Sequence, residues 1–117
     1  MSRTDRQRLE DIVAACQAIA AHLRRGDATD DLVFDAIRIR LVEIGEAIKD
    51  IPNDVLSKEP AIPWRDIAGM RDHLAHRYFD TARSVVNETA LHDIPGLLGA
   101  VNRILAAPGY GEEVEGE

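Results

Sequence analysis

The fold is decided by the stretch DLVFDAIRIRLVEIGEAIKDI, residues 31–51, in which two sets of apolar side chains recur at helical spacing. The larger set falls on one face at about 100° per residue, the period of an α-helix, and consists of Val33, Ile37, Leu41, Ile44, Ala47, Ile48 and Ile51. The smaller set lies on roughly the opposite face and consists of Leu32, Ile39 and Val42. A helix with two apolar faces packs on both sides. In a chain this small, we expect the second face to contact another subunit.

A second helical pattern precedes this stretch. Thr4 and Gln7 have the spacing of a capping box, which predicts a helix over about residues 4–25 that Gly26 ends. The residues at 29–31, Thr-Asp-Asp, begin the next helix with acids where the helix dipole favours them. The apolar stripe of the first helix consists of Leu9, Ile12, Val13, Cys16, Ile19, Ala20 and Leu23.

Three more helices are expected downstream. After a connector over residues 52–63 that has room for one helical turn, Pro63 suits the first position of a third helix. Asp80 or Thr81 can cap a fourth, and Asp93, followed by a proline, marks the start of the last. The apolar positions of these helices are Ile67, Met70 and Leu74; Val85, Val86 and Ala90; and Leu97, Leu98, Val101, Ile104 and Leu105.

Composition agrees with one helical domain. The chain has 117 residues, of which 45% are hydrophobic and 30% charged, the profile of a globular protein. Aromatic residues make up only 4%, which favours helices packed through aliphatic side chains. We therefore expect an all-α, single-domain bundle over residues 1–109, followed by a frayed acidic tail over 110–117.

Charge and cysteine content exclude several classes of protein. The net charge of −7 argues against a basic surface for nonspecific binding of nucleic acid, and we expect no DNA partner. No apolar stretch approaches the roughly 20 residues that cross a bilayer. The charged N-terminus does not resemble a signal peptide, and the single Cys16, expected to be buried in its helix, cannot form an internal disulfide. These features predict a cytoplasmic protein.

The segment RDHLAHRYFD, residues 71–80, concentrates the reactive side chains. If the third helix continues through it, Arg71 and Tyr78 lie within about 20° of each other around the axis. Asp72 and His76 are four residues apart, so the carboxylate can contact the imidazole. A cation, an oriented imidazole and a phenol would then gather near one helix end.

Two simpler interpretations of this segment remain open. His73 and Arg77 form a second pair at the same spacing, and all these groups can belong to the solvated face of a surface helix. Alternatively, His73, His76 and Asp80 can bind a metal ion. The metal site is disfavoured because no clear fourth ligand is present and the neighbouring arginines repel a cation.

Cleavage of an RNA phosphodiester is the reaction that these side chains suit. His76 can act as a general base or acid near neutral pH. Arg71 can bind the scissile phosphate and stabilise the charge that develops on it, while Asp72 can fix the histidine tautomer. RNA supplies its own nucleophile in the 2′-hydroxyl, so the reaction requires neither a metal nor another cofactor.

The motif and its surroundings resemble a known family. IPWRDIAGMRDHLAHRYF, residues 62–79, closely resembles the Arg-x4-His-x-Tyr signature of the HepT-like toxins of the HEPN superfamily. The segments EIGEAIKDIP, residues 43–52, and DIPGLL, residues 93–98, are also similar to the family, so the resemblance covers nearly the whole chain. One departure is Arg77, because a glycine often follows the histidine in these proteins.

The resemblance implies a bundle of four to five helices that forms homodimers, with the two motifs facing each other across a cleft for RNA. It also implies a metal-independent endoribonuclease, the toxin of a type VII-like toxin–antitoxin pair. Arg71, His76 and Asp72 would be catalytic, and Arg77 and His73 would support RNA binding. A minimal nucleotidyltransferase antitoxin, with which the dimer can assemble further, would neutralise the toxin by adenylylating Tyr78. The alternative function is a non-catalytic helical partner of the nucleotidyltransferase.

Overall fold

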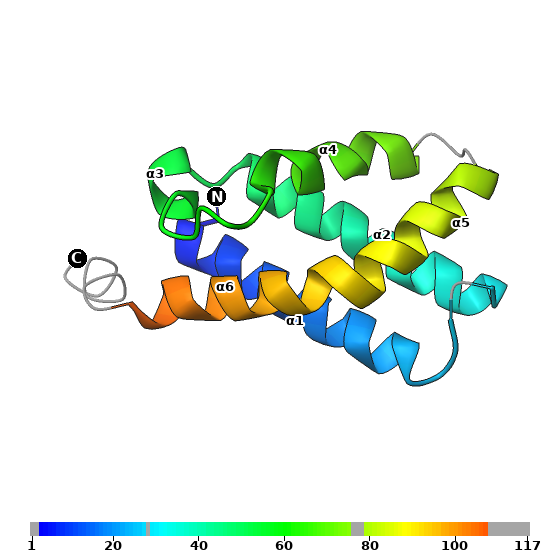
Figure 1. The fold of residues 1–117 in the computed structure, drawn as a ribbon. Helices are drawn as coiled ribbons and strands as arrows, with labels where there is room; N and C mark the ends of the chain where they lie inside the picture. Colours follow the sequence, from blue (N-terminus) through cyan, green and yellow to red (C-terminus); the bar gives the residue numbers. More distant parts are fainter. Residues whose placement is uncertain (1–2, 28, 76–78, 108–117) are drawn as a thin grey trace.

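The computed structural model describes residues 3–27, 29–75 and 79–107, and in these ranges the chain is helical and contains no strand (Figure 1). The elements in chain order are α1 (Asp5–Leu23), α2 (Asp31–Lys49), α3 (Asn53–Leu56), α4 (Trp64–Ala75), α5 (Phe79–Glu88), the π-helical turn η1 (Thr89–Asp93) and α6 (Ile94–Ala106). The all-α prediction is therefore confirmed. The predicted acidic tail lies outside the described residues.

Helices α1 and α2 begin where their capping residues predict. The Gln7 backbone N–H donates to Thr4 Oγ1 at 3.0 Å, and the Thr4 N–H donates to Gln7 Oε1 at 2.9 Å, which completes the capping box. The Asp30 carboxylate accepts from the backbone N–H groups of Leu32 and Val33 at the start of α2. Each cap satisfies N–H groups that have no partner within the helix.

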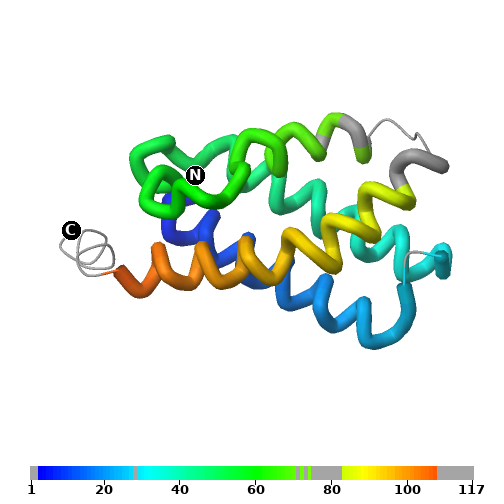
Figure 2. The backbone as a smooth tube through the Cα atoms, in the orientation of Figure 1, coloured from blue at the N-terminus to red at the C-terminus, as the bar shows by residue number. Residues whose placement is uncertain are grey.

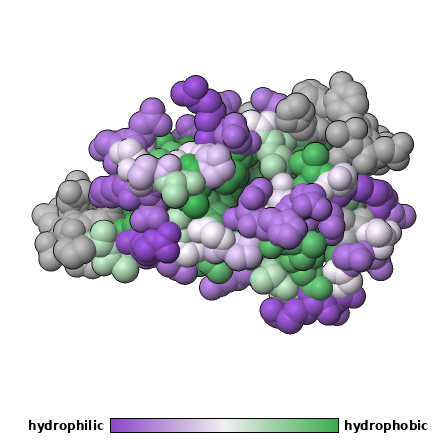
Figure 3. Space-filling view, viewed as in Figure 1, coloured by the Kyte–Doolittle hydropathy of each residue, from purple (hydrophilic) through white to green (hydrophobic). Residues whose placement is uncertain are grey.

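The core lies around α2, which packs against α1 on one side and α4 on the other. The larger apolar set of α2 faces inward, as predicted, and Phe34 joins it. On α1, the predicted stripe is buried or packed against the core except for Ala20, which is exposed, whereas Ala15 is buried. Polar side chains cover most of the face seen in Figure 3, with apolar ones visible between the helices.

A connector and α3 lead into α4. The predicted single helical turn is α3, at Asn53–Leu56. Helix α4 begins at Trp64, so Pro63 directly precedes the helix instead of occupying its first position. The Trp64 indole N–H donates to the carbonyl of Glu59 at 3.0 Å, and the Arg103 guanidinium binds the Glu59 carboxylate at 2.7 Å. These contacts anchor the connector to α6.

The C-terminal half differs from the prediction at the helix starts. Asp80 and Thr81 already lie inside α5, so neither is its cap. Asp93 makes no capping hydrogen bond through its side chain, because α5, η1 and α6 form one continuous helical run (Figure 2). Pro95 has no N–H to offer the α-helical ladder. Just before it, the Ile94 N–H bonds to the carbonyl of Thr89, five residues back, in a π-helical turn.

Within the residues that the structure describes, no helix combines the length and the apolar character needed to cross a membrane.

Candidate functional site

Helix α4 carries the first half of the predicted motif. The backbone of Arg71, Asp72 and His73 lies in its C-terminal part, and the Asp72 side chain is exposed. The side chains of Arg71 and His73 and the whole of residues 76–78 lie outside the described part of the chain. The predicted i, i+4 pairs and the convergence of Arg71 with Tyr78 therefore stay predictions.

The end of α4 is fixed to the bundle by a buried side chain and by a polar contact. Leu74 is 1% exposed and, with Ile67, forms the inward-facing stripe of α4. The Arg38 guanidinium, from α2, donates to the backbone carbonyl of Leu74 at 3.0 Å. A cation at this position also suits the negative end of the helix dipole. The chain is thus anchored two residues before His76.

A second anchor lies after the motif, in α5. Arg83, in α5, forms an ion pair with Asp31 at the start of α2. The Arg83 guanidinium also lies over the ring of Phe34, with Cζ 4.6 Å from the ring centroid. These contacts were not predicted from the sequence, in which Asp31 has the position of a helix-start residue and Arg38 belongs to no motif.

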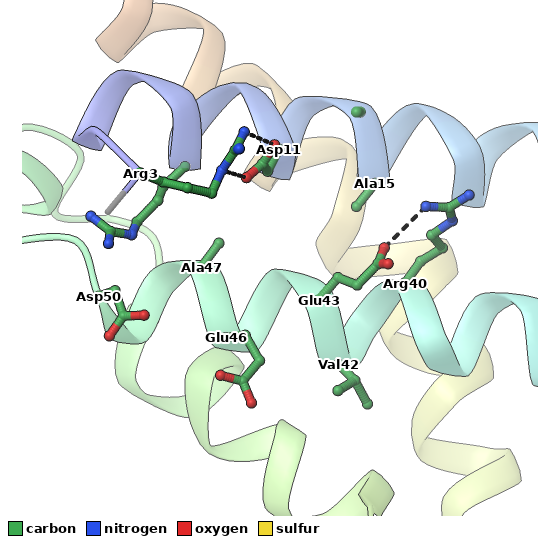
Figure 4. Close-up of a pocket in the computed structure, with 11 residues that line it drawn as sticks. Arg3, Asp11, Ala15, Arg40, Val42, Glu43, Glu46, Ala47 and Asp50 are labelled. Carbon is green, nitrogen blue, oxygen red and sulfur yellow. Dashed lines mark hydrogen bonds and ion pairs between the residues drawn. The ribbon is translucent and has the colours of Figure 1, made fainter. Parts of the chain in front are cut away.

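The chain also has a groove between α1 and α2, of about 440 Å³, whose lining residues Figure 4 shows. The groove is bordered by two exposed ion pairs, Arg3 with Asp11 at 2.7 Å and Arg40 with Glu43 at 3.0 Å. Its lining contains no histidine, cysteine or serine, so it offers neither a usual nucleophile nor an imidazole base. The groove does not replace the motif as the candidate site.

Other reactive groups in the described residues do not form a competing site. Cys16 is buried, as predicted, and burial raises the pKa of its thiol to about 12. The thiol therefore stays protonated and is a poor nucleophile. Among the described side chains, no group of three or more His, Cys, Asp or Glu converges on one point. The alternative metal site of His73, His76 and Asp80 lies outside those side chains.

Comparisons with known proteins identify a family whose profile covers the motif segment. The sequence profile of the family described as "Ribonuclease HepT-like" matches residues 7–104, which include the whole Arg71–Tyr78 motif. The chain is 37% identical over 108 residues to a protein of Caldanaerobacter subterraneus subsp. tengcongensis named as an RNase, covering 88% of this chain and 96% of that protein. It is 40% identical over 108 residues to the "Probable ribonuclease HepT" of Thermococcus cleftensis, covering 89% and 98%.

No solved structure matches the chain. The family assignment thus rests on the sequence profile, on relatives that align along almost their whole length, and on an all-helical fold that agrees with them. The chain belongs to the HepT-like family of ribonucleases within the HEPN superfamily.

Proposed function

We propose that this protein cleaves RNA internally, without a metal ion, through the motif at residues 71–78. The observation that carries the proposal is the uninterrupted Arg-x4-His-x-Tyr motif inside the region that matches the ribonuclease family. His76 takes the proton of a ribose 2′-hydroxyl, and the 2′-oxygen attacks the adjacent phosphorus. The bond to the 5′-oxygen breaks, and that oxygen takes a proton. The products are a 2′,3′-cyclic phosphate and a 5′-hydroxyl.

The other polar residues of the motif support this reaction. Arg71 binds the phosphate and stabilises the charge that develops on it. Asp72, whose side chain is exposed on α4, orients the His76 imidazole. Arg77 and His73 add positive charge or hydrogen bonds for the RNA backbone.

We further propose that the active form is a homodimer that pairs through the outer face of α2. Leu32 is 81% exposed and Ile39 is 49% exposed in the single chain, whereas Val42 is partly packed against the core. Ile39 directly follows Arg38, which contacts the motif-bearing end of α4. A second copy on this face would therefore bring the two motifs close to one another.

The cellular role that we propose is that of a toxin controlled by a nucleotidyltransferase antitoxin, which can join the dimer in a larger assembly. The antitoxin transfers adenylate from ATP to the Tyr78 phenol oxygen and releases pyrophosphate. The new phosphate then pairs with Arg71 in place of the RNA backbone, because Arg–phosphate contacts are strong and often bidentate. The nucleoside fills space that RNA bases require, so no change of fold is needed.

The cleavage reaction is tested by following RNA ends after incubation with purified protein in excess EDTA. Wild type should produce cyclic phosphate ends, and His76→Ala and Arg71→Ala should each lower the rate at least about 1,000-fold while remaining folded. His92→Ala is the matched control, because His92 is exposed and lies outside the motif. Strict dependence on an added divalent metal would instead favour the site of His73, His76 and Asp80. Absence of cleavage by a folded, unmodified wild type would favour the non-catalytic partner.

Control by the antitoxin is tested by mass spectrometry after incubation with the neighbouring nucleotidyltransferase, ATP and magnesium. Adenylate should be found on Tyr78, with loss of cleavage. Tyr110→Phe is the matched control, because it removes the only other tyrosine of the chain and should leave both results unchanged. If Tyr78→Phe still cleaves RNA and the antitoxin silences it fully, modification of the tyrosine is not the means of control.

A further inference from the structure

One stripe of α2 contacts the chain on both sides of residues 76–78, the second half of the motif. Asp31, Phe34 and Arg38 are spaced at i, i+3 and i+7, so they lie on the same side of the helix. Arg38 binds the carbonyl of Leu74, while Asp31 and Phe34 both contact Arg83. Figure 1 shows that α2 runs alongside α4 and that α5 crosses α2.

The contact at Leu74, which lies inside the motif and before His76, combines packing with a charge-assisted hydrogen bond. The Arg38 side chain is half-buried between the two helices, and its acceptor belongs to a residue whose own side chain is fully in the core. Hydrogen bonds that involve a charged donor are about twice as strong as neutral ones. Leu74 is thus held through both its side chain and its backbone.

The contact after the motif combines an ion pair with an aromatic surface. Asp31 is largely exposed, and an exposed ion pair alone contributes about 0–1 kcal/mol. The Phe34 ring, however, is buried and gives the Arg83 guanidinium a fixed surface to lie on. A guanidinium that both stacks and pairs is held in one orientation.

We propose that the stripe of Asp31, Phe34 and Arg38 is a positioning clamp for the ribonuclease motif. It fixes the chain at Leu74 and again at Arg83, and so limits where the intervening motif residues can lie. The inference rests on the proposed function. A displacement of about 1 Å at a reacting group can lower a rate about 100-fold, so two fixed points close to the motif matter for catalysis.

The first test uses Arg38. Arg38→Met should lower kcat about 10- to 100-fold with KM changed less than about threefold, because the clamp orients catalytic groups and does not itself bind RNA. Arg38→Lys should recover much of the rate, since an ammonium can still donate to the Leu74 carbonyl. The matched control is Arg40→Met, which removes the same type of side chain from an exposed ion pair two residues away. Equal kcat for Arg38→Met and Arg40→Met would overturn the proposal.

The second test combines the two ends of the clamp. Arg83→Met should lower kcat in the same way, with Arg103→Met as the control from an exposed ion pair on α6. If both arginines position one segment, the double variant of Arg38 and Arg83 should lose less activity than the product of the single losses. Fully multiplicative losses would show that Arg38 and Arg83 act independently and would contradict a single clamp.

A third measurement does not depend on activity. Hydrogen exchange of the peptide covering residues 75–82 should be at least about threefold faster in Arg38→Met than in Arg40→Met, while exchange in α1 stays unchanged. Faster exchange confined to this peptide would support the clamp even if the wild type cuts no RNA, which would refute only the proposed reaction. Unchanged exchange would overturn the clamp whatever the activity.

Discussion

The hairpin of α1 and α2 and the arm of α4 and α5 are held in different ways. The hairpin has a capped start on each helix and a continuous apolar stripe on each helix, buried against the core. The arm carries the motif, and its ends near the motif are tied to α2 by arginine contacts that join residues 36 and 52 positions apart in the chain. Burial of one large aliphatic side chain contributes about 1.5–3 kcal/mol, more than a typical exposed ion pair.

Because of this difference, we expect the hairpin to determine mainly the stability of the protein and the arginine contacts of the arm to determine mainly its activity. Substitutions in the hairpin should change the free energy of unfolding, because they remove buried contacts. Substitutions at the arginine contacts of the arm should change where catalytic groups lie, at a small cost in stability. An enzyme of this size can thus combine a stable helical base with a reactive segment that a few arginine contacts hold in position.

The largest effect on stability is expected for Ile37→Ala in α2. Ile37 is fully buried at the centre of the core, so the substitution should lower the free energy of unfolding by about 2–5 kcal/mol. Leu91→Ala, at a position 48% exposed in η1, should cost far less. Urea unfolding at one fixed protein concentration measures both, since the proposed dimerisation would make stability depend on concentration. Equal losses of unfolding free energy in the two variants would mean that the buried contacts of the hairpin are not the main source of stability.

The next largest effect tests the outer face of α2. Ile39→Asp should weaken self-association by about 3 kcal/mol, roughly a hundredfold, because it places a charge in the proposed interface. Sedimentation at micromolar concentration should then show monomers, and RNA cleavage should fall with the dimer. Leu91→Asp is the control, because Leu91 is as exposed as Ile39 but lies in η1. A fully active Ile39→Asp dimer would place the interface elsewhere.

A smaller effect is expected at the start of the hairpin. Thr4→Ala removes the hydroxyl that accepts the Gln7 N–H and should lower the free energy of unfolding by about 1 kcal/mol. Gln7→Ala removes the reciprocal bond. Because both belong to one capping box, the loss in the double variant should differ from the sum of the single losses. Simple additivity in thermal unfolding would show that the two bonds act separately.

The smallest effect concerns the connector between the two regions. The hydrogen bond from Arg103, together with its positive charge, lowers the pKa of Glu59. A carboxylate whose pKa is lowered by folding stabilises the native state above its unfolded pKa, about 4.3, and this contribution is lost as the pH falls through the folded pKa. At pH 7 the melting temperature of the wild type should therefore be slightly higher than that of Glu59→Gln. The difference should vanish once the pH falls below the folded pKa of Glu59. A difference that persists in acid would have another origin.

Much of the fold could be predicted from local patterns. The capping box at Thr4 and the inward face of α2 were predicted correctly, because each depends on residues within a few turns of one helix. The predicted start of the last helix at Asp93 was correct, because α6 begins at Ile94 with Asp93 in the N-cap position. The Asp93 side chain makes no capping hydrogen bond, because the preceding segment is itself helical. The exposure of Ala20 was missed because a small residue at the edge of a stripe does not reveal whether a neighbour covers it.

The sequence by itself determined the helical class of the chain and its family and supplied the candidate reactive residues, because period, caps and motif spacing are properties of neighbouring positions. Only the tertiary structure decided that Arg38 meets the Leu74 carbonyl and that Arg83 meets α2. The two residues of each pair are far apart in the chain. The sequence around an arginine on an amphipathic helix does not indicate which residue the arginine will contact once the helices pack. The contacts before and after residues 76–78 were therefore visible only after the helices had been packed.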